Sequence, residues 1–354
     1  MQNYLKIVDN TKFPTNFEPL KHEKYYRRSL VTKAKGVGVY GSNYTLKIDR
    51  KINNLKKIDV KVSITTDVSM APLLPDNIGS FFCKNIMLSE KDGLNMANLR
   101  SEYLLSRKNE DDGSQTYKYK AGGNDIFFDG AAVTTEGYFF INLPLSISEL
   151  DTLPLRQLNE VKLDFYLNDT PIKMGFPAGI EVTSVKIEAI LDYFEYENEP
   201  IRSIFNGYNT FYETPLKLSL TADTWTTVKT DLTFKSPVYN MACICIKDGK
   251  TANFADVIYM KITCENETVK ESYKVADFYY NQELQTYITS NSQYKSWLAD
   301  EKDRKNQNGL FPPGSNAVYQ LELIVKSSDT SNYTLNIIYE YPYSYDIKNK
   351  GFRF

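Results

Sequence analysis

Apolar and polar residues alternate with a period of two along most of the chain after residue 40. The clearest runs are Tyr44–Ile48, Ile58–Ile64 and Val161–Leu167, where every second side chain is apolar. This alternation is typical of a strand with one face against a core and the other in water. Further strands are predicted at 80–88, 138–143, 182–196, 216–220, 228–234, 241–246, 257–264, 318–326 and 333–341. The pattern predicts half-buried antiparallel strands.

Turn residues, rather than helices, separate most of these strands. Asp112-Gly113, Asp248-Gly249 and Pro312-Pro313-Gly314 are typical turn sequences. The clearest helix candidate is 291–306, where Tyr294, Trp297 and Leu298 form a short apolar stripe, and a weaker turn is predicted at 146–152. Strands without long intervening helices predict an antiparallel all-β architecture, because parallel sheets need helical crossovers.

The two halves of the chain correspond to each other. Val185–Tyr193 and Tyr333–Tyr341 lie 148 residues apart, and their apolar, polar, acidic and tyrosine positions coincide. The strand before each also matches, Val161–Phe165 with Tyr319–Leu323. This self-similarity predicts two similar all-β domains of about 150 residues.

The predicted boundaries follow from this repeat. Residues 1–40 form a polar N-terminal arm, 41–198 a first β domain, 199–345 a second and 346–354 a C-terminal tail. The junction lies where Glu197-Asn198-Glu199-Pro200 interrupts the alternation.

Composition narrows the functional classes. The chain has 354 residues, of which 14% are aromatic, including 27 Tyr, so it has the side chains for packed cores and is not disordered. A single histidine, His22, removes most metal-ligand, triad and imidazole-base chemistry. No Walker loop, GxGxxG turn, GxSxG elbow or HExxH helix occurs, so we expect a protein that is not an enzyme and needs no metal or other cofactor.

The cysteines and the N-terminus indicate where the protein folds. Cys83, Cys243, Cys245 and Cys264 lie in strand-like runs without metal-ligand spacing, which favours buried, reduced thiols. No apolar run has the length of a signal sequence core or a membrane span. We therefore expect folding in a reducing, aqueous compartment.

Positive charge is concentrated in the predicted arm. The net charge of the chain is only −2, which argues against an electrostatic grip on nucleic acid by the whole protein. Within 20–35, however, six basic residues accompany only Glu23: Lys21, Lys24, Arg27, Arg28, Lys33 and Lys35. They would suit an arm that faces packaged nucleic acid or an internal membrane. The alternative is a solvated or inter-subunit tail.

One local segment carries a family resemblance. Ile86–Leu94 runs from a strand into an acidic turn containing Asp92 and Gly93, and Arg100–Leu105 follows as an amphipathic segment. This resembles the double jelly-roll major capsid proteins of icosahedral viruses. The chain departs from the family pattern, which usually has a Gly-Gly pair in this turn and a Trp near the position of Tyr103. The equivalent turn of the second half, Glu265–Thr268, contains no glycine.

The resemblance implies an all-β fold of two tandem eight-stranded antiparallel jelly rolls with few short helices. It also implies a viral structural protein that assembles as pseudo-hexagonal homotrimers into an icosahedral shell. The expected partners are further copies, neighbouring capsomers and other capsid proteins, with the arm contacting the genome or an internal membrane. The expected location is the virion, after assembly in the host cytoplasm. The long segments 107–136 and 281–314 would form outward loops.

Two other classes stay open. A carbohydrate-binding protein with two β-sandwich domains, either a lectin or a virion attachment or minor capsid protein, would stack sugars on tyrosine clusters. These clusters are Tyr25-Tyr26, Tyr279-Tyr280 and Tyr339–Tyr345. Packing and subunit interfaces use tyrosine for the same physical reason, and we favour interfaces for these clusters. A glycosidase would need paired acids, for which Asp192 and Glu340 are candidates, although repetition of the two domains explains them better. We interpret the acidic runs 110–112 and 300–303 as solvated loops rather than cation sites.

Overall fold

The structure is a computed structural model of residues 1–354. The description covers these residues: 25–52, 54–68, 78–91, 95–104, 136–145, 152–196, 204–233, 240–248, 254–264, 267–273, 286–288, 294–298, 318–349 and 351–353. Contacts divide the chain into two compact units. The first unit comprises residues 18–209 and 343–353, and the second unit comprises 1–17, 210–342 and 354. Each unit is described by itself.

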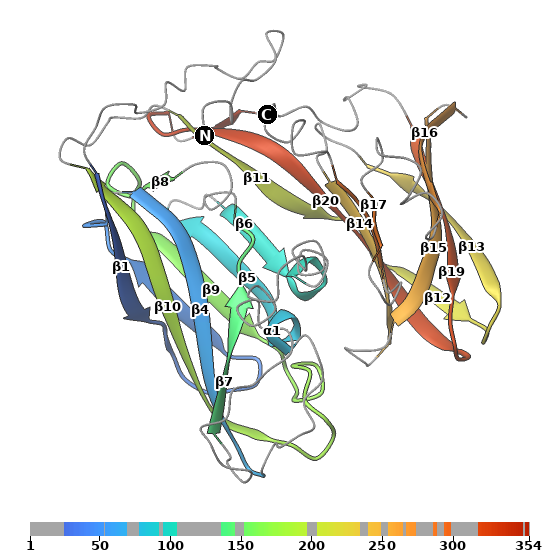
Figure 1. Cartoon of the computed structure of the whole chain (residues 1–354), viewed down its shortest axis with the longest axis horizontal. Coiled ribbons are helices and arrows are strands. Elements are labelled where there is room, and N and C mark those ends of the chain that lie inside the picture. Colours follow the sequence, from blue (N-terminus) through green and yellow to red (C-terminus); the bar gives the residue numbers. More distant parts are fainter. Residues whose placement is uncertain are drawn as a thin grey trace. The chain divides into compact units, whose positions relative to one another are not determined.

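The first unit is built from two five-stranded antiparallel sheets (Figure 1). One has the order β1-β10-β4-β7, with β8 added to β4. The other has the order β2-β3-β9-β5-β6. The elements are β1 (Tyr25–Lys33), β2 (Lys35–Gly36), β3 (Asn43–Ile48), β4 (Asn54–Thr66), α1 (Ile78–Phe81), β5 (Cys83–Glu90), β6 (Asn95–Arg100), β7 (Glu136–Asn142), β8 (Leu153–Pro154), β9 (Val161–Leu167) and β10 (Val182–Tyr196).

The core of the first unit follows from the alternation in the sequence. In β4, Val60, Val62 and Ile64 are buried while the residues between them are partly exposed. Opposite Val62 in the same sheet lies Ile187 of β10, which is also buried. Period-two patterning therefore places one face of this sheet in the core, where apolar surface is removed from water.

The remaining strands are connected in one hydrogen-bonded path β11-β20-β14-β15-β19-β13 with side branches, and most of them belong to the second unit. Only Cys245↔Ala255 and Ile246↔Phe254 pair β14 with β15, so the path turns a corner there between two layers. The strands are β11 (Ile204–Tyr212), β12 (Leu216–Leu220), β13 (Trp225–Leu232), β14 (Asn240–Lys247), β15 (Phe254–Cys264), β16 (Glu267–Tyr273), β17 (Thr286–Ile288), β18 (Tyr294–Leu298), β19 (Tyr319–Lys326), β20 (Ser331–Asp346) and β21 (Gly351–Arg353). β11 and β20 contribute residues to both units, and β21 belongs to the first unit.

Eight strands of each unit share one topology. In the first unit the two layers are β1-β10-β4-β7 and β3-β9-β5-β6, and in the second they are β12-β20-β14-β18 and β13-β19-β15-β16. The strands occur in the same chain order within both sets. Most chain neighbours lie in different layers, the exceptions being the hairpins β5–β6 and β15–β16, and this is the connectivity of a jelly roll. The predicted fold of two tandem eight-stranded jelly rolls is confirmed, and so is the correspondence between β9–β10 and β19–β20.

The N-terminal region differs from the expected arm. Residues 25–33 lie within the predicted arm 1–40, but they form β1, which pairs with β10 over nine residues from Tyr25↔Tyr196 to Lys33↔Glu188. β1 holds the place that β12 holds in the second unit, so the first roll needs it as a strand. The predicted domain junction at 197–200 lies outside the described residues.

The helix predicted over 291–306 is wrong for the residues the structure describes. Residues 294–298 form β18, which pairs with β14 on one side and β17 on the other. The three-residue spacing from Tyr294 to Trp297 resembled a helical stripe, but tertiary pairing with β14 overrides so short a signal. The expected turn at 146–152 lies almost wholly outside the described residues.

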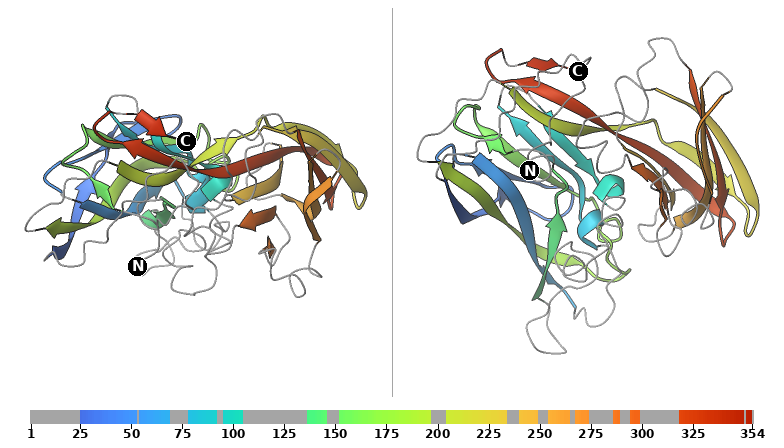
Figure 2. Two further views of the ribbon diagram at one scale, coloured as in Figure 1. Left: turned by 90° about the horizontal axis from the view of Figure 1, so that it is seen from above. Right: turned by 45° about the horizontal axis from the view of Figure 1, so that its top comes forward.

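The C-terminal residues belong to an ordered hairpin rather than a loose tail. Ser344–Asp346 of β20 pair with Gly351–Arg353 of β21, next to the C-terminus in Figure 2. Asp346 is buried, and its carboxylate accepts hydrogen bonds from the backbone N–H of Asn349 at 3.0 Å and from its side-chain amide at 2.8 Å. These bonds close the turn of the hairpin.

Candidate assembly surface

β1 is the edge strand of its sheet and carries most of the described basic residues of the predicted arm. One side of β1 pairs with β10, and no described strand pairs with the other side. Leu30 and Val31 at its centre are 43% and 61% exposed, respectively. An edge with free backbone groups and exposed apolar side chains is a ready template for contact with another chain. We take β1 as the candidate assembly edge.

The basic side chains of β1 pair with acids on β10. Arg27 Nη2 lies 2.7 Å from Asp192 Oδ2, and Arg28 forms an ion pair with Glu195. Asp192 also accepts a hydrogen bond from the Ser29 hydroxyl. Burial alone would raise the pKa of Asp192, but the bonds from Ser29 and Arg27 outweigh it and hold that pKa below its usual value.

The charge of this edge is therefore smaller than the sequence suggests. The charges of Arg27 and Arg28 are balanced within the sheet by their acidic partners. Lys33 and Lys35 are exposed, and Lys33 lies opposite Glu188, whose pKa is lowered mainly by Lys186 and to a smaller extent by Lys33. Lys21 and Lys24 lie outside the described residues. Of the six candidate cations, the structure brings four together on β1 and β2.

The predicted roll-defining turn, Asp92 and Gly93, also lies outside the described residues. The strand before this turn is β5, and its last residue, Glu90, makes two hydrogen bonds. Glu90 is 2% exposed, and its Oε1 accepts a hydrogen bond from the backbone N–H of Asn159 at 2.5 Å. Its Oε2 accepts one from the Tyr345 hydroxyl at 3.1 Å. The carboxylate thus joins β5, the segment before β9 and the C-terminal part of β20 within the first unit.

A second contact ties the same C-terminal segment to the first unit. The Tyr343 hydroxyl donates a hydrogen bond to the carbonyl oxygen of Met96 in β6 at 3.2 Å. The rings of Tyr343 and Tyr345 are buried, as is the ring of Tyr339 in the second unit. These three residues belong to the tyrosine cluster 339–345, which the sequence offered as a sugar platform or subunit interface. Burial in the fold makes both roles wrong for them.

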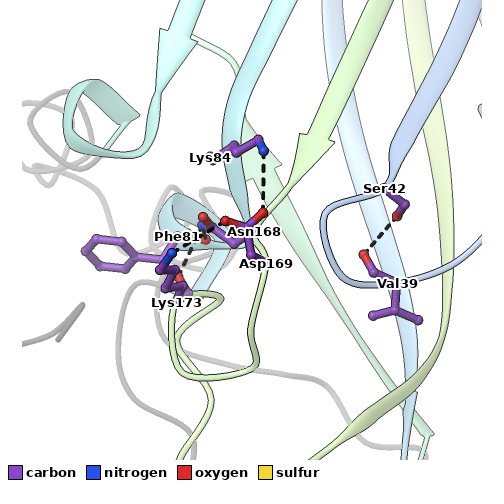
Figure 3. Close-up of polar contacts among 7 residues, drawn as sticks. All are labelled: Val39, Ser42, Phe81, Lys84, Asn168, Asp169 and Lys173. Atoms are coloured by element: carbon purple, nitrogen blue, oxygen red, sulfur yellow. Dashed lines mark hydrogen bonds and ion pairs between the residues drawn. The ribbon is translucent and has the colours of Figure 1, made fainter. Parts of the chain in front are cut away.

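A polar cluster orders the loop between β9 and β10 (Figure 3). The Asn168 side-chain amide donates to the carbonyl oxygens of Phe81 at 2.5 Å and Lys173 at 3.2 Å. Asp169 Oδ1 lies 3.4 Å from Lys84 Nζ, and Asp169 Oδ2 lies 3.4 Å from Lys173 Nζ. The charge of Lys84, followed by the hydrogen bond from Lys173, lowers the pKa of Asp169. The loop therefore has a defined shape while its charges stay in water.

The remaining candidate residues are the two carboxylates considered as a glycosidase pair and the cysteines. Asp192 and Glu340 occupy equivalent strands of separate units, as the repetition of the two domains predicts. Cys83, Cys243 and Cys245 are buried free thiols, and burial raises the pKa of Cys245 to about 12. In the described ranges no cluster of His, Cys, Asp and Glu could hold a metal ion. No helix there is long and apolar enough to span a membrane.

The two repeated eight-stranded units define a class, the double jelly-roll proteins. No protein-family model matches the chain, and no curated protein matches it. Solved structures do. The chain is similar to VP54 of the virus PBCV-1, with a TM-score of 0.65 and 14% identity over 94% of this chain and 97% of that one.

Two further solved structures, both of viral major capsid proteins, are similar to the chain over most of its length. The major capsid protein of Sulfolobus turreted icosahedral virus gives a TM-score of 0.54 and 14% identity, covering 90% of this chain and 97% of that one. The mavirus major capsid protein gives a TM-score of 0.53 and 11% identity, covering 97% and 92%. The chain therefore shares its whole double jelly-roll fold with viral major capsid proteins.

Proposed function

We propose that the protein is a viral major capsid protein, a structural protein without catalytic activity. The observation that carries the proposal is the length of the match: the structural similarity to VP54 covers 94% of this chain and 97% of that one, and so includes both jelly rolls. Function does not follow from most folds, but a fold shared from end to end with several capsid proteins favours the same role. The protein would lie in the virion capsid after assembly in the host cytoplasm.

In the proposed mechanism, copies of the chain assemble through complementary surfaces. Two rolls of the same topology in each chain supply six similar units per homotrimer, which suits a pseudo-hexagonal capsomer. Such trimers would tile with neighbouring capsomers and other capsid proteins into an icosahedral shell. The exposed edge of β1, with Leu30 and Val31, supports a contact between chains, because pairing would cover it.

Light scattering coupled to size exclusion, with negative-stain images of the same peak, tests this proposal. One chain has a mass of 40.7 kDa, so a homotrimer has about 122 kDa. We expect that species, with a hexagonal outline. A monomer at every concentration, without particles in any assembly condition, would refute the major capsid role.

We further propose that the basic N-terminal region faces the capsid interior, toward the genome or an internal membrane. The group comprises Lys21, Lys24, Arg27, Arg28, Lys33 and Lys35. Because Arg27 and Arg28 are paired with β10, the contact would rest mainly on the lysines. Cations that neutralise phosphates release counterions, so such binding weakens as salt rises.

A short deletion separates this role from folding. Removing residues 1–24 leaves β1 intact, whereas removing 1–35 would also strip a strand from the sheet. We expect the 1–24 deletion to give soluble trimers that assemble poorly. The double variant K33Q/K35Q should weaken binding to DNA or to anionic vesicles, while K217Q/K229Q, with the same charge loss on the second unit, should not. Normal particles from the deletion would exclude the interior role.

A further inference from the structure

Trp225 is a large aromatic side chain that the fold leaves in water. It begins β13, the edge strand of the second unit's path, and is 66% exposed. The other exposed large apolar side chains in the described ranges are aliphatic: Leu30, Val31, Val37, Val68, Ile172 and Val318. A ring so exposed adds little to the core. Tryptophan in such a place is the residue type most often found at binding hot spots.

The loop that presents Trp225 is firmly held. Between β12 and β13, Asp223 has a φ of 55°, which is uncommon for a residue other than glycine. Its backbone N–H donates to the carbonyl oxygen of Ser327 at 2.8 Å. The N–H of Ala222 donates to Thr330 Oγ1 at 3.0 Å. Unusual backbone conformations of this kind persist where the surroundings hold them, and they concentrate at functional sites.

The turn that supports this loop is itself braced. The Tyr333 hydroxyl donates to Asp329 Oδ1 at 2.7 Å and accepts a bond from the Ser327 hydroxyl at 2.7 Å. Lys247 forms an ion pair with Asp329. Trp225 thus stands next to a loop and a turn that lose little freedom on binding, which favours affinity.

Polar groups stand beside the ring. Trp225 lies opposite Lys326 of β19, and Lys326 in turn lies opposite Asp256 of β15. Directly opposed residues on antiparallel strands share a face, with Cβ atoms about 4.5–5.5 Å apart. Lys326 Nζ also lies 3.2 Å from Asp223 Oδ1, and the Asp223 side chain is 75% exposed. One row therefore offers an aromatic face, an ammonium group and carboxylates.

From this arrangement we propose that Trp225, Asp223 and Lys326 form a binding site for a neutral pyranose ring of a glycan. The apolar C–H face of the sugar stacks on the indole, while its hydroxyl groups donate to the Asp223 carboxylate and accept from Lys326. A flat aromatic ring with a few fixed polar groups supplies both the apolar contact and the orientation that a sugar needs. Hydrogen bonds to charged groups are the stronger kind.

The surroundings favour a sugar over other occupants. Two positions further along the same face, beyond Thr227, Lys229 pairs with Glu322 at 2.9 Å, and Glu322 lies opposite Lys261 of β15. A protein partner large enough for a stable interface would remove these charges from water, which is costly. A nucleic acid would bring its phosphates toward Asp223 and Asp256. A single sugar ring covers the indole and leaves the ion pairs hydrated.

A glycan array of defined neutral and acidic oligosaccharides, probed with the full-length protein, tests the proposal. We expect binding to at least one class of neutral glycan, and about a tenfold or greater loss of affinity in W225A. W225F should retain part of the binding. D223N should reduce it, because asparagine also tolerates the left-handed conformation but lacks the charge. The matched control is V318A, which shortens a similarly exposed side chain of the same unit and should bind normally.

Each contrary result is decisive. Absence of binding to every glycan on the array would overturn the proposal, as would equal binding by the wild type and W225A. If W225A bound no differently but failed to form particles, a second copy would be the occupant of Trp225 and the sugar site would be wrong. The glycan site does not depend on the capsid role, since a monomer that binds through Trp225 would support it alone.

Discussion

Removal of one hydroxyl group in the C-terminal segment should loosen the first roll by a predictable amount. Tyr345 is 2% exposed, so Y345F keeps the buried ring and deletes the O–H that donates to Glu90. A hydrogen bond to a carboxylate contributes about 1.5–3 kcal/mol, and the Glu90 carboxylate keeps its bond from the backbone N–H of Asn159 in the variant. We expect Y345F to lower the free energy of unfolding of the first unit by about 1.5–3 kcal/mol.

The neighbouring tyrosine supplies a matched control. Y343F deletes a hydroxyl two residues earlier on the same strand, and this hydroxyl donates to the carbonyl oxygen of Met96 at 3.2 Å. A bond between neutral groups contributes about 0.5–1.5 kcal/mol, so the loss should be smaller. The difference isolates the charge on Glu90, because both variants keep the buried ring.

Urea denaturation and amide hydrogen exchange measure both variants. The denaturation midpoint should fall further in Y345F than in Y343F at an unchanged slope. At about 1.4 kcal/mol per tenfold change, exchange of amides near the end of β20 should speed up by roughly ten- to a hundredfold in Y345F. An effect of Y345F equal to or smaller than that of Y343F would refute the assignment of Glu90 as a charged acceptor.

Three further predictions follow from packing and charge. The pKa of Asp192 is lowered in the fold, so its carboxylate stabilises the protein above the ordinary aspartate pKa of about 3.9 and loses that effect as pH falls through the lowered value. The stability deficit of D192N, followed by urea denaturation from pH 7 to pH 2.5, should be constant near neutrality and shrink in acid, whereas a deficit independent of pH would contradict the pairing. Leu163 and Leu321 are both 0% exposed at equivalent places in β9 and β19, so L163A and L321A should each cost about 2–5 kcal/mol, read as a lower midpoint in calorimetry. A loss below about 1 kcal/mol in either variant would be inconsistent with a packed core. Burial raises the pKa of the Cys83 and Cys243 thiols, so alkylation of the native protein followed by mass spectrometry should leave both unmodified, and rapid labelling would disprove their burial.

Local patterning predicted most strands, because alternation records directly which side chains meet the core. Val161–Leu167 was predicted and is β9, and the buried members of β19 and β20 recur where the repeat placed them. Elements with weak or misleading patterns were harder. The sequence of β1 lacks a clear alternation, and the spacing in β18 resembled a helix, so only their pairing with β10 and β14 identifies them as strands.

The candidate sites, too, could be predicted from the sequence only in part. The basic run near the N-terminus is visible in the sequence, but its ion pairs with Asp192 and Glu195 join residues about 165 positions apart. The tyrosines of the 339–345 cluster looked available for contacts until the fold buried three of them. The exposure of Trp225 was not predicted among the many aromatic residues, which include 27 tyrosines. No sequence pattern distinguishes an exposed aromatic residue at the start of a strand from a buried one.

By itself, the sequence determined the all-β class, the twofold repeat and the core faces of most strands, since each depends on neighbours a few residues apart or on the repeat of one pattern. The tertiary structure alone decided that β1 joins the first sheet, that Glu90 holds the C-terminal strand and that Trp225 stands in water next to Asp223 and Lys326. Those outcomes depend on strand order and long-range pairing, which bring together residues that no local pattern connects.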